Sequence, residues 1–141
     1  RQRQMCIRDR YWDNWLSFIR SSVMSDGYVS DLDDRFFSIV TDPTQAGRVL
    51  TDFYRNYHSM RMVGTTMVLR MKQAPTPEQL AEVRKRFSHF VPKGTIDIIE
   101  ATQPERASHD ETNLARLGFE FDRRSYGDVR DLITYINTWV D

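Results

Sequence analysis

The sequence predicts a mixed α/β chain in two parts: the trailing elements of an α/β domain, then a small two-layer α+β sandwich. Periodicities over residues 11–58 predict a helix, a strand and a helix, which is the alternation of an α/β layer. Residues 59–141 predict a hairpin, a helix, two strands and a helix. Because the first part has a single strand, it lacks the partners of a complete sheet.

Residues 1–10, RQRQMCIRDR, are set apart from both parts. They carry four Arg and one Asp, with neither a helical apolar stripe nor strand alternation. They also lack the apolar core of a secretory signal and the Ser-rich amphipathic pattern of a transit peptide. The segment resembles a peptide that recurs at the ends of metagenomic reading frames, where adapter sequence has been translated. We therefore expect residues 1–10 to be non-native.

Two helices and a strand are predicted in the first part. The helix over residues 11–26 has an apolar stripe at spacings of three and four, formed by Trp12, Trp15, Leu16, Ile19 and Val23. The run FFSIV, residues 36–40, has the length and composition of a strand. Asp42 and Pro43 predict the cap and first residue of a second helix, running to about His58. Without a complete sheet, the first helix and the strand should expose apolar faces.

A hairpin and a capped helix begin the second part. Extended runs over residues 59–63 and 66–72 flank Gly64-Thr65, a hairpin signal because glycine tolerates positive φ. The sequence Thr76-Pro77-Glu78-Gln79 predicts a helix start, with Thr as the cap and Gln three residues later. Leu80, Val83, Phe87 and Phe90 would form the buried face of this helix.

Two further strands and a last helix complete the sandwich. Strands are predicted over residues 95–101 and 114–122, separated by the polar segment 102–113, which we expect to be a mobile loop. A capping box at Ser125 to Asp128 would begin the last helix. This order of elements places both helices on one face of a four-stranded sheet.

Composition excludes several classes of function. The 20 Lys and Arg balance 20 Asp and Glu, and without residues 1–10 the formal charge falls to −3, so nucleic acid is not an expected partner. No apolar run approaches 18 residues, so no membrane span is expected. The single cysteine, Cys6, excludes a disulfide framework and is typical of a reducing cytoplasm. We therefore expect a cytoplasmic protein.

Four stretches together resemble a known family: YWDNWLSFIRSSVMSDGYVS, FFSIVTDPTQAGRVL, FYRNYHSMRMVGTTMVLRMK and LARLGFEFDRRSYGDVRDLI. They are similar to the C-terminal portion of Lonely Guy (LOG) family proteins, often labelled lysine-decarboxylase-like, in their longer bacterial form. The resemblance implies a cytosolic, homodimeric, Rossmann-like protein. Its expected reaction is hydrolysis of the N-glycosidic bond of a nucleoside 5′-monophosphate, giving a base and ribose 5-phosphate, with no metal or organic cofactor.

The catalytic signature of that family is absent from this chain. The signature is Pro-Gly-Gly-x-Gly-Thr-x-x-Glu, in which glycines let backbone amides approach a phosphate. Gly64-Thr65 and Gly94-Thr95 both lack the preceding Pro-Gly-Gly. We therefore expect no catalytic residue here, and we expect the chain alone to be inactive even if its parent is a hydrolase.

The junction of the two parts holds the candidate ligand-binding residues, Arg55, His58 and Arg61. With Tyr54 and Tyr57 they could hold a phosphate or a base by charge-assisted hydrogen bonds and stacking. Alternatively, the aromatic rings pack the end of a helix and the arginines bind carbonyl or acidic neighbours. A second interpretation of the chain as a whole is a non-catalytic module for ligand sensing or oligomerisation, by analogy of fold alone.

No metal site is predicted. The acidic segment around Asp31, Asp33 and Asp34 lacks the glycine and the distal acid of an EF-hand loop. His89 and His109 have no paired ligands nearby in the sequence.

Overall fold

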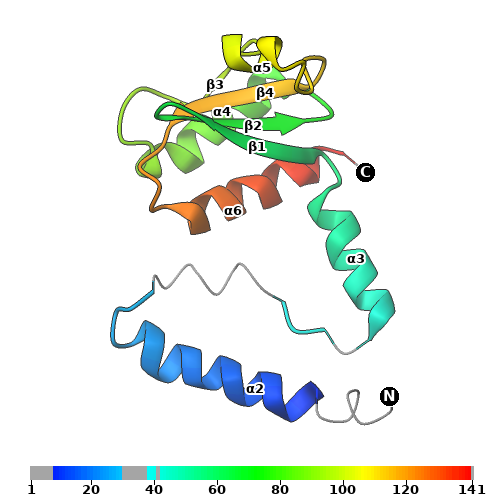
Figure 1. Cartoon of the computed structure of the whole chain (residues 1–141), viewed down its shortest axis with the longest axis vertical. Coiled ribbons are helices and arrows are strands. Elements are labelled where there is room, and N and C mark those ends of the chain that lie inside the picture. Colours follow the sequence, from blue (N-terminus) through cyan, green and yellow to red (C-terminus); the bar gives the residue numbers. More distant parts are fainter. Residues whose placement is uncertain (1–7, 30–37, 41, 141) are drawn as a thin grey trace.

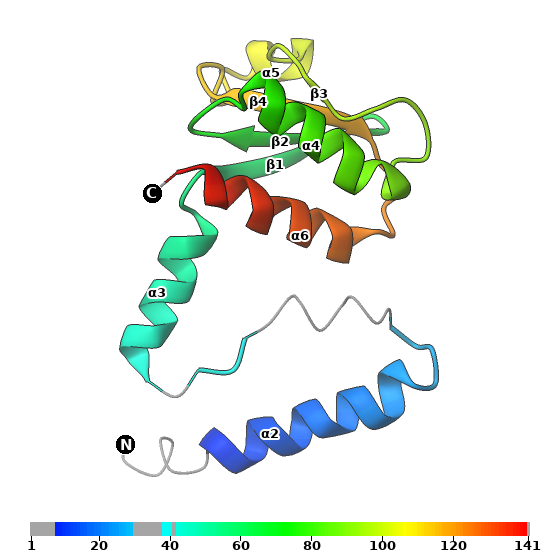
Figure 2. The ribbon, with the colours of Figure 1, turned by 180° about the vertical axis from the view of Figure 1, so that it is seen from behind.

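The structure is a computed structural model that describes residues 8–29, 38–40 and 42–140. Its centre is a four-stranded antiparallel sheet with the strand order β1-β2-β4-β3 (Figure 1). Helices α4 and α6 cover one face, as the view from behind also shows (Figure 2). The general α+β class predicted for the second part is therefore confirmed.

The hairpin forms where it was predicted. Strands β1 (Tyr57–Val63) and β2 (Thr66–Met71) pair with Val63 opposite Thr66, and Gly64 takes a φ of +63° at the turn. β4 (Ala115–Glu120) pairs with β2 over its whole length. β3 (Asp97–Ile98) is shorter than the predicted strand over residues 95–101 and pairs only with β4.

Helices α4 (Pro77–Phe87) and α6 (Tyr126–Ile136) are continued by short 3-10 turns, η3 (Ser88–Phe90) and η4 (Asn137–Trp139). The predicted capping box of α4 is confirmed by reciprocal bonds between Thr76 and Gln79, at 3.2 and 2.8 Å. The box predicted at Ser125 is wrong, because its Asp128 pairs with His89 instead, at 2.9 Å.

One hydrophobic core lies between the sheet and these two helices. Alternate residues of β2 and β4 point into it, as the two-residue period of a strand requires. Its members are almost fully buried and include Met67, Leu69, Met71, Val83, Phe87, Leu117, Phe119, Leu132, Ile133 and Ile136. This core is built almost entirely from residues 59–141, and Tyr57 at the start of β1 also belongs to it.

The segment 102–113 corrects the prediction of a mobile loop. It contains a short helix, α5 (Gln103–Ala107), so the order is hairpin, helix, strand, short helix, strand, helix. Glu105 is fully buried and accepts two bonds from Thr102 through its Oε2, at 2.9 and 2.7 Å. The segment contains no large apolar side chain before Leu114, and a buried carboxylate anchors it in place of apolar packing.

The first part contains α2 (Arg8–Phe18), its π-helical continuation η1 (Ile19–Met24) and α3 (Pro43–Phe53). Asp42 caps α3 as predicted, accepting from Gln45 N at 2.8 Å. The helix predicted to reach His58 ends at Phe53, because the chain then enters β1 at Tyr57. In the predicted strand over residues 36–40, residues 36 and 37 lie outside the described residues, and 38–40 form no strand.

The first helix leaves its apolar side chains exposed or only half-buried, in agreement with the expectation. None of residues 11–24 is buried, and Trp12 and Phe18 are 44% and 56% exposed. Ile39, at the end of the predicted strand, is also exposed. No helix in the described parts of the chain combines the length and apolar character needed to cross a membrane.

Candidate functional site

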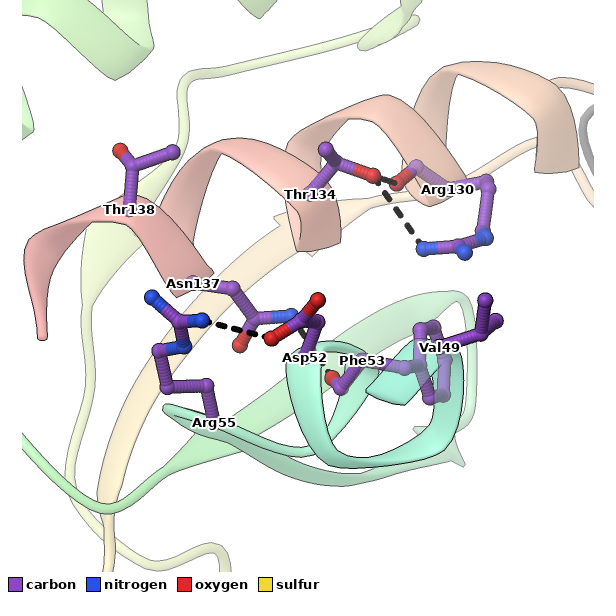
Figure 3. A pocket seen from close by; sticks show the side chains of 8 residues that line it. All are labelled: Val49, Asp52, Phe53, Arg55, Arg130, Thr134, Asn137 and Thr138. Carbon is purple, nitrogen blue, oxygen red and sulfur yellow. Dashed lines mark hydrogen bonds and ion pairs between the residues drawn. The ribbon is translucent and has the colours of Figure 1, made fainter. Parts of the chain in front are cut away.

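A pocket of about 330 Å³ lies where the end of α3 meets α6 (Figure 3). Its walls come from segments some 75 positions or more apart in sequence, which the fold places side by side (Figure 2). The lining combines two arginines, one carboxylate, hydroxyl groups and an aromatic ring: Val49, Asp52, Phe53, Arg55, Arg130, Thr134, Asn137 and Thr138.

Asn137 fixes the walls of this pocket in place. Its Oδ1 accepts from the backbone N–H groups of Asn56, at 2.9 Å, and Tyr57, at 2.7 Å. Its Nδ2 donates to the carbonyl of Phe53 at 2.7 Å. The side chain of a residue that follows α6 therefore holds both the last turn of α3 and the start of β1, so the pocket is formed in advance of any ligand.

Arg130 supplies one cation of the pocket. Its guanidinium lies 4.4 Å from the ring centre of Phe53 and donates to Thr134 Oγ1 at 3.2 Å. Burial lowers the pKa of Arg130, but a guanidinium stays charged at neutral pH. Among the described residues, no carboxylate forms an ion pair with Arg130. It is a half-buried charge for which the described part of the chain supplies no counter-ion.

Arg55 supplies the other cation and is paired. Its Nη2 lies 2.6 Å from Asp52 Oδ1, with the two side chains 41% and 61% exposed. An ion pair this exposed contributes about 0.2–1 kcal/mol. The carbonyls of Tyr54 and Arg55 both accept from Lys72 Nζ, so the backbone of this turn is held onto β2.

The structure places the three predicted ligand residues in different surroundings. Arg55 lines the pocket, whereas Arg61 donates from β1 to Asp110 at 2.8 Å and Ser108 at 3.2 Å. His58 is half-buried, with its Nδ1 3.0 Å from Ser59 Oγ. In the described structure, no hydrogen bond or ion pair joins these three side chains to one another. Their shared role in ligand binding stays a prediction.

The aromatic residues of the junction pack against each other. Tyr57 is buried in the core, and its ring lies 5.2 Å from that of Phe53 and 5.9 Å from that of Tyr54. Burial, followed by the proximity of Tyr54, raises the pKa of Tyr57. This packing agrees with the alternative in which the rings fill the end of a helix, and it leaves Tyr57 no access to a ligand.

A network of buried charges occupies the other face of the sheet. Glu105 Oε1 accepts from Arg70 Nε at 2.8 Å and from Arg116 Nε at 3.2 Å. Asp110 binds both Arg70, through Nη2 at 2.7 Å, and Arg61. Burial by itself would raise the pKa of Glu105, but hydrogen bonds from Thr102, Arg70 and Arg116 lower it to about 2. The network holds α5 and the segment after it against the sheet.

Neither this network nor the α6 side of the pocket was predicted from the sequence. Arg70 and Arg116 alternate with apolar residues, which in an antiparallel sheet usually indicates a solvent-facing side chain. The Thr102-x-x-Glu105 pattern was a capping-box signal that could have revealed α5. Arg130 and Asn137 carried no comparable local signal.

Comparison with known proteins found no relative of this chain. No protein-family model, no curated protein and no solved structure matches this chain.

Proposed function

We propose that this chain is the C-terminal portion of a LOG-like nucleoside 5′-monophosphate phosphoribohydrolase. Residues 11–58 would be the trailing elements of its Rossmann-like domain, and residues 59–141 a module without catalytic residues. The parent would be a cytoplasmic homo-oligomer that uses water to release a base and ribose 5-phosphate. The proposal rests on the four stretches of resemblance given above.

One structural observation supports it. α2 and the segment before α3 enclose an apolar hollow of about 520 Å³ that opens to solvent, lined by Trp12, Trp15, Ser38, Ile39, Val40, Asp42, Pro43 and Ala46. A folded monomer normally covers such apolar surface. The second part, in contrast, has a closed core. This contrast is expected if the first part belongs to a larger domain and the second is a separate unit.

The test begins with the genomic sequence upstream of Tyr11. An in-frame Pro-Gly-Gly-x-Gly-Thr-x-x-Glu motif is expected there, and its absence would overturn the proposal. The product carrying that motif should release base and ribose 5-phosphate from a nucleoside monophosphate, whereas the 141-residue chain should not. Activity of the 141-residue chain by itself would also contradict the proposal, because it lacks the signature.

The role of the junction arginines is tested in the same full-length protein. Arg55→Ala and Arg61→Ala should each raise the Michaelis constant if the two side chains contact the nucleotide. An unchanged Michaelis constant with a lowered melting temperature would mean that they only stabilise the junction, through Asp52 and Asp110.

The second candidate is a non-catalytic module for ligand sensing or oligomerisation. The pocket between α3 and α6 favours its ligand-sensing form, because it is preformed and holds Arg130, a cation that pairs with no carboxylate within residues 8–29, 38–40 and 42–140. The two candidates are compatible, since a sensing module could be attached to a catalytic domain. Equilibrium binding to the 141-residue chain tests the second candidate without any need for catalysis.

A further inference from the structure

We propose that the pocket between α3 and α6 binds the oxyanion group of a small molecule, with Arg130 as its main cation and Arg55 as its second. The proposal deepens the ligand-sensing candidate by naming its ligand chemistry, and it does not require the parent to be a phosphoribohydrolase.

The charges that line the pocket are unbalanced. Its lining carries two guanidinium groups and one carboxylate, Asp52. Asp52 is paired with Arg55, which leaves the charge of Arg130 without a counter-ion among the described residues. A partly desolvated cation gains more from an anion than an exposed one, because the local dielectric constant is lower. An oxyanion is the ligand that restores the balance.

Arg130 is already positioned to bind an anion. Its guanidinium is held against the ring of Phe53 and bonded to Thr134, which in turn donates to the carbonyl of Arg130 at 3.0 Å. A single N–H of the guanidinium is used in these contacts, out of five. The remaining donors have the planar geometry that binds carboxylate and phosphate groups through two parallel bonds. Little side-chain entropy remains to be lost on binding.

Asp52 lies between Arg55 and Arg130 in Figure 3. Its carboxylate accepts from Arg55 through one oxygen, in an ion pair open to solvent. A bound oxyanion would therefore compete with Asp52 for Arg55 and would be repelled by it. Removing the charge of Asp52 should tighten binding, an effect that a purely structural role of these residues would not produce.

The size of the pocket restricts the ligand. A volume of about 330 Å³ is close to the lower end of ligand pockets, which span roughly 300–1,000 Å³. The hydroxyls of Thr134 on α6 and of Thr138 on η4 both donate to backbone carbonyls, at 3.0 and 2.7 Å. Their oxygens are therefore available mainly as acceptors, and that of Thr134 already accepts one bond from Arg130. The pocket thus suits a compact phosphorylated or carboxylated molecule with a hydroxyl or amino donor.

The test uses the 141-residue chain and isothermal titration at fixed ionic strength. Inorganic phosphate and malonate are the probes, and sodium chloride is the reference. Saturable binding with a Kd of about 1 mM or tighter, absent with chloride, is expected for at least one probe. The probe bound more tightly distinguishes a phosphate from a carboxylate ligand. Equal, non-saturable heats for all three salts would overturn the proposal.

Three variants decide whether the binding occurs in this pocket. Arg130→Ala should weaken it at least tenfold, and Asp52→Asn should tighten it about fivefold. Arg123→Ala is the matched control, since Arg123 is an exposed arginine that contacts Gly64 at the far end of the hairpin. If Arg130→Ala fails to fold by circular dichroism, Asp52→Asn decides. Unchanged or weaker binding in Asp52→Asn would overturn the proposal.

Discussion

Asn56 and Asn137 lie 81 positions apart and are joined by their hydrogen bonds. Asn56 N donates to Asn137 Oδ1 at 2.9 Å, while Asn56 Nδ2 donates to the carbonyl of Ile136 at 3.1 Å. Asn56 Oδ1 also accepts from Gln73 N at 2.8 Å, just after β2. Two buried amides therefore fasten the ends of α3, β2 and α6 to one another, and they set the position of the pocket.

Replacing Asn137 by Ala should destabilise the chain by roughly 2–4 kcal/mol, because the buried N–H groups of Asn56 and Tyr57 lose their acceptor. Urea unfolding at pH 7 measures this loss. Asn113→Ala is the control, since Asn113 is exposed, and it should change stability by about 0.5 kcal/mol or less. Equal effects of the two substitutions would show that the buried bonds contribute nothing.

The hairpin and the cap of α4 could be predicted because their signals are local. Gly64 and the Thr76-to-Gln79 box act within four residues of the chain, and both predictions are confirmed. The bonds of Asn137 could not be predicted, because its partners lie 80 or more positions away. The residues around Asn137 in the sequence do not show which distant backbone groups it will bond.

The buried charges on the face of the sheet opposite the core could not be predicted from the sequence. Arg70 and Arg116 have the alternation of exposed positions, yet both are nearly fully buried. They are tolerated there because both form ion pairs with Glu105, the one buried residue of the otherwise exposed helix α5. The burial of the two arginines requires α5 to lie against the sheet, and the position of α5 requires the ion pairs with the arginines. Because each depends on the other, neither could be predicted first from the sequence.

Replacing Glu105 by Gln should cost about 3 kcal/mol, since it removes the carboxylate shared by Arg70 and Arg116 and leaves buried charge uncompensated. Glu100→Gln removes an exposed carboxylate five positions earlier and is the matched control. Chemical denaturation of both variants measures the difference. A loss in Glu105→Gln no larger than in Glu100→Gln would contradict a structural role for the network.

Stability should fall in acid through the same network. The pKa of Glu105 is about 2 in the folded chain and about 4.5 as an ordinary value, and hydrogen bonds from Arg70 and Arg61 likewise lower that of Asp110. A lowered pKa means that the contribution is complete above pH 4.5 and is lost as the pH falls toward 2.

Unfolding midpoints in urea at pH 7, 5, 3.5 and 2.5 follow this loss. The slope between pH 5 and 2.5 should be shallower in Glu105→Gln than in the unmodified chain, because the group that titrates is gone. Identical slopes would mean that the acid sensitivity arises from other carboxylates.

Gly118 lies on β4, where a side chain would meet Ile99. A Cβ added at Gly118 would stand 2.6 Å from Ile99 Cδ1 and 3.0 Å from Ile99 Cγ2, so the side chain of Ile99 must shift. Gly118→Ala should therefore reduce the free energy of unfolding by about 1–3 kcal/mol through overpacking.

Gly47→Ala is the control, since a Cβ there meets nothing within 4 Å and alanine favours the helical conformation of α3. Thermal unfolding should show a lowered midpoint for Gly118→Ala and an unchanged or raised one for Gly47→Ala. The double variant Gly118→Ala with Ile99→Ala completes the test, because the smaller side chain at position 99 should relieve most of the destabilisation caused by Gly118→Ala. If the double variant shows no such relief, overpacking against Ile99 is not the cause.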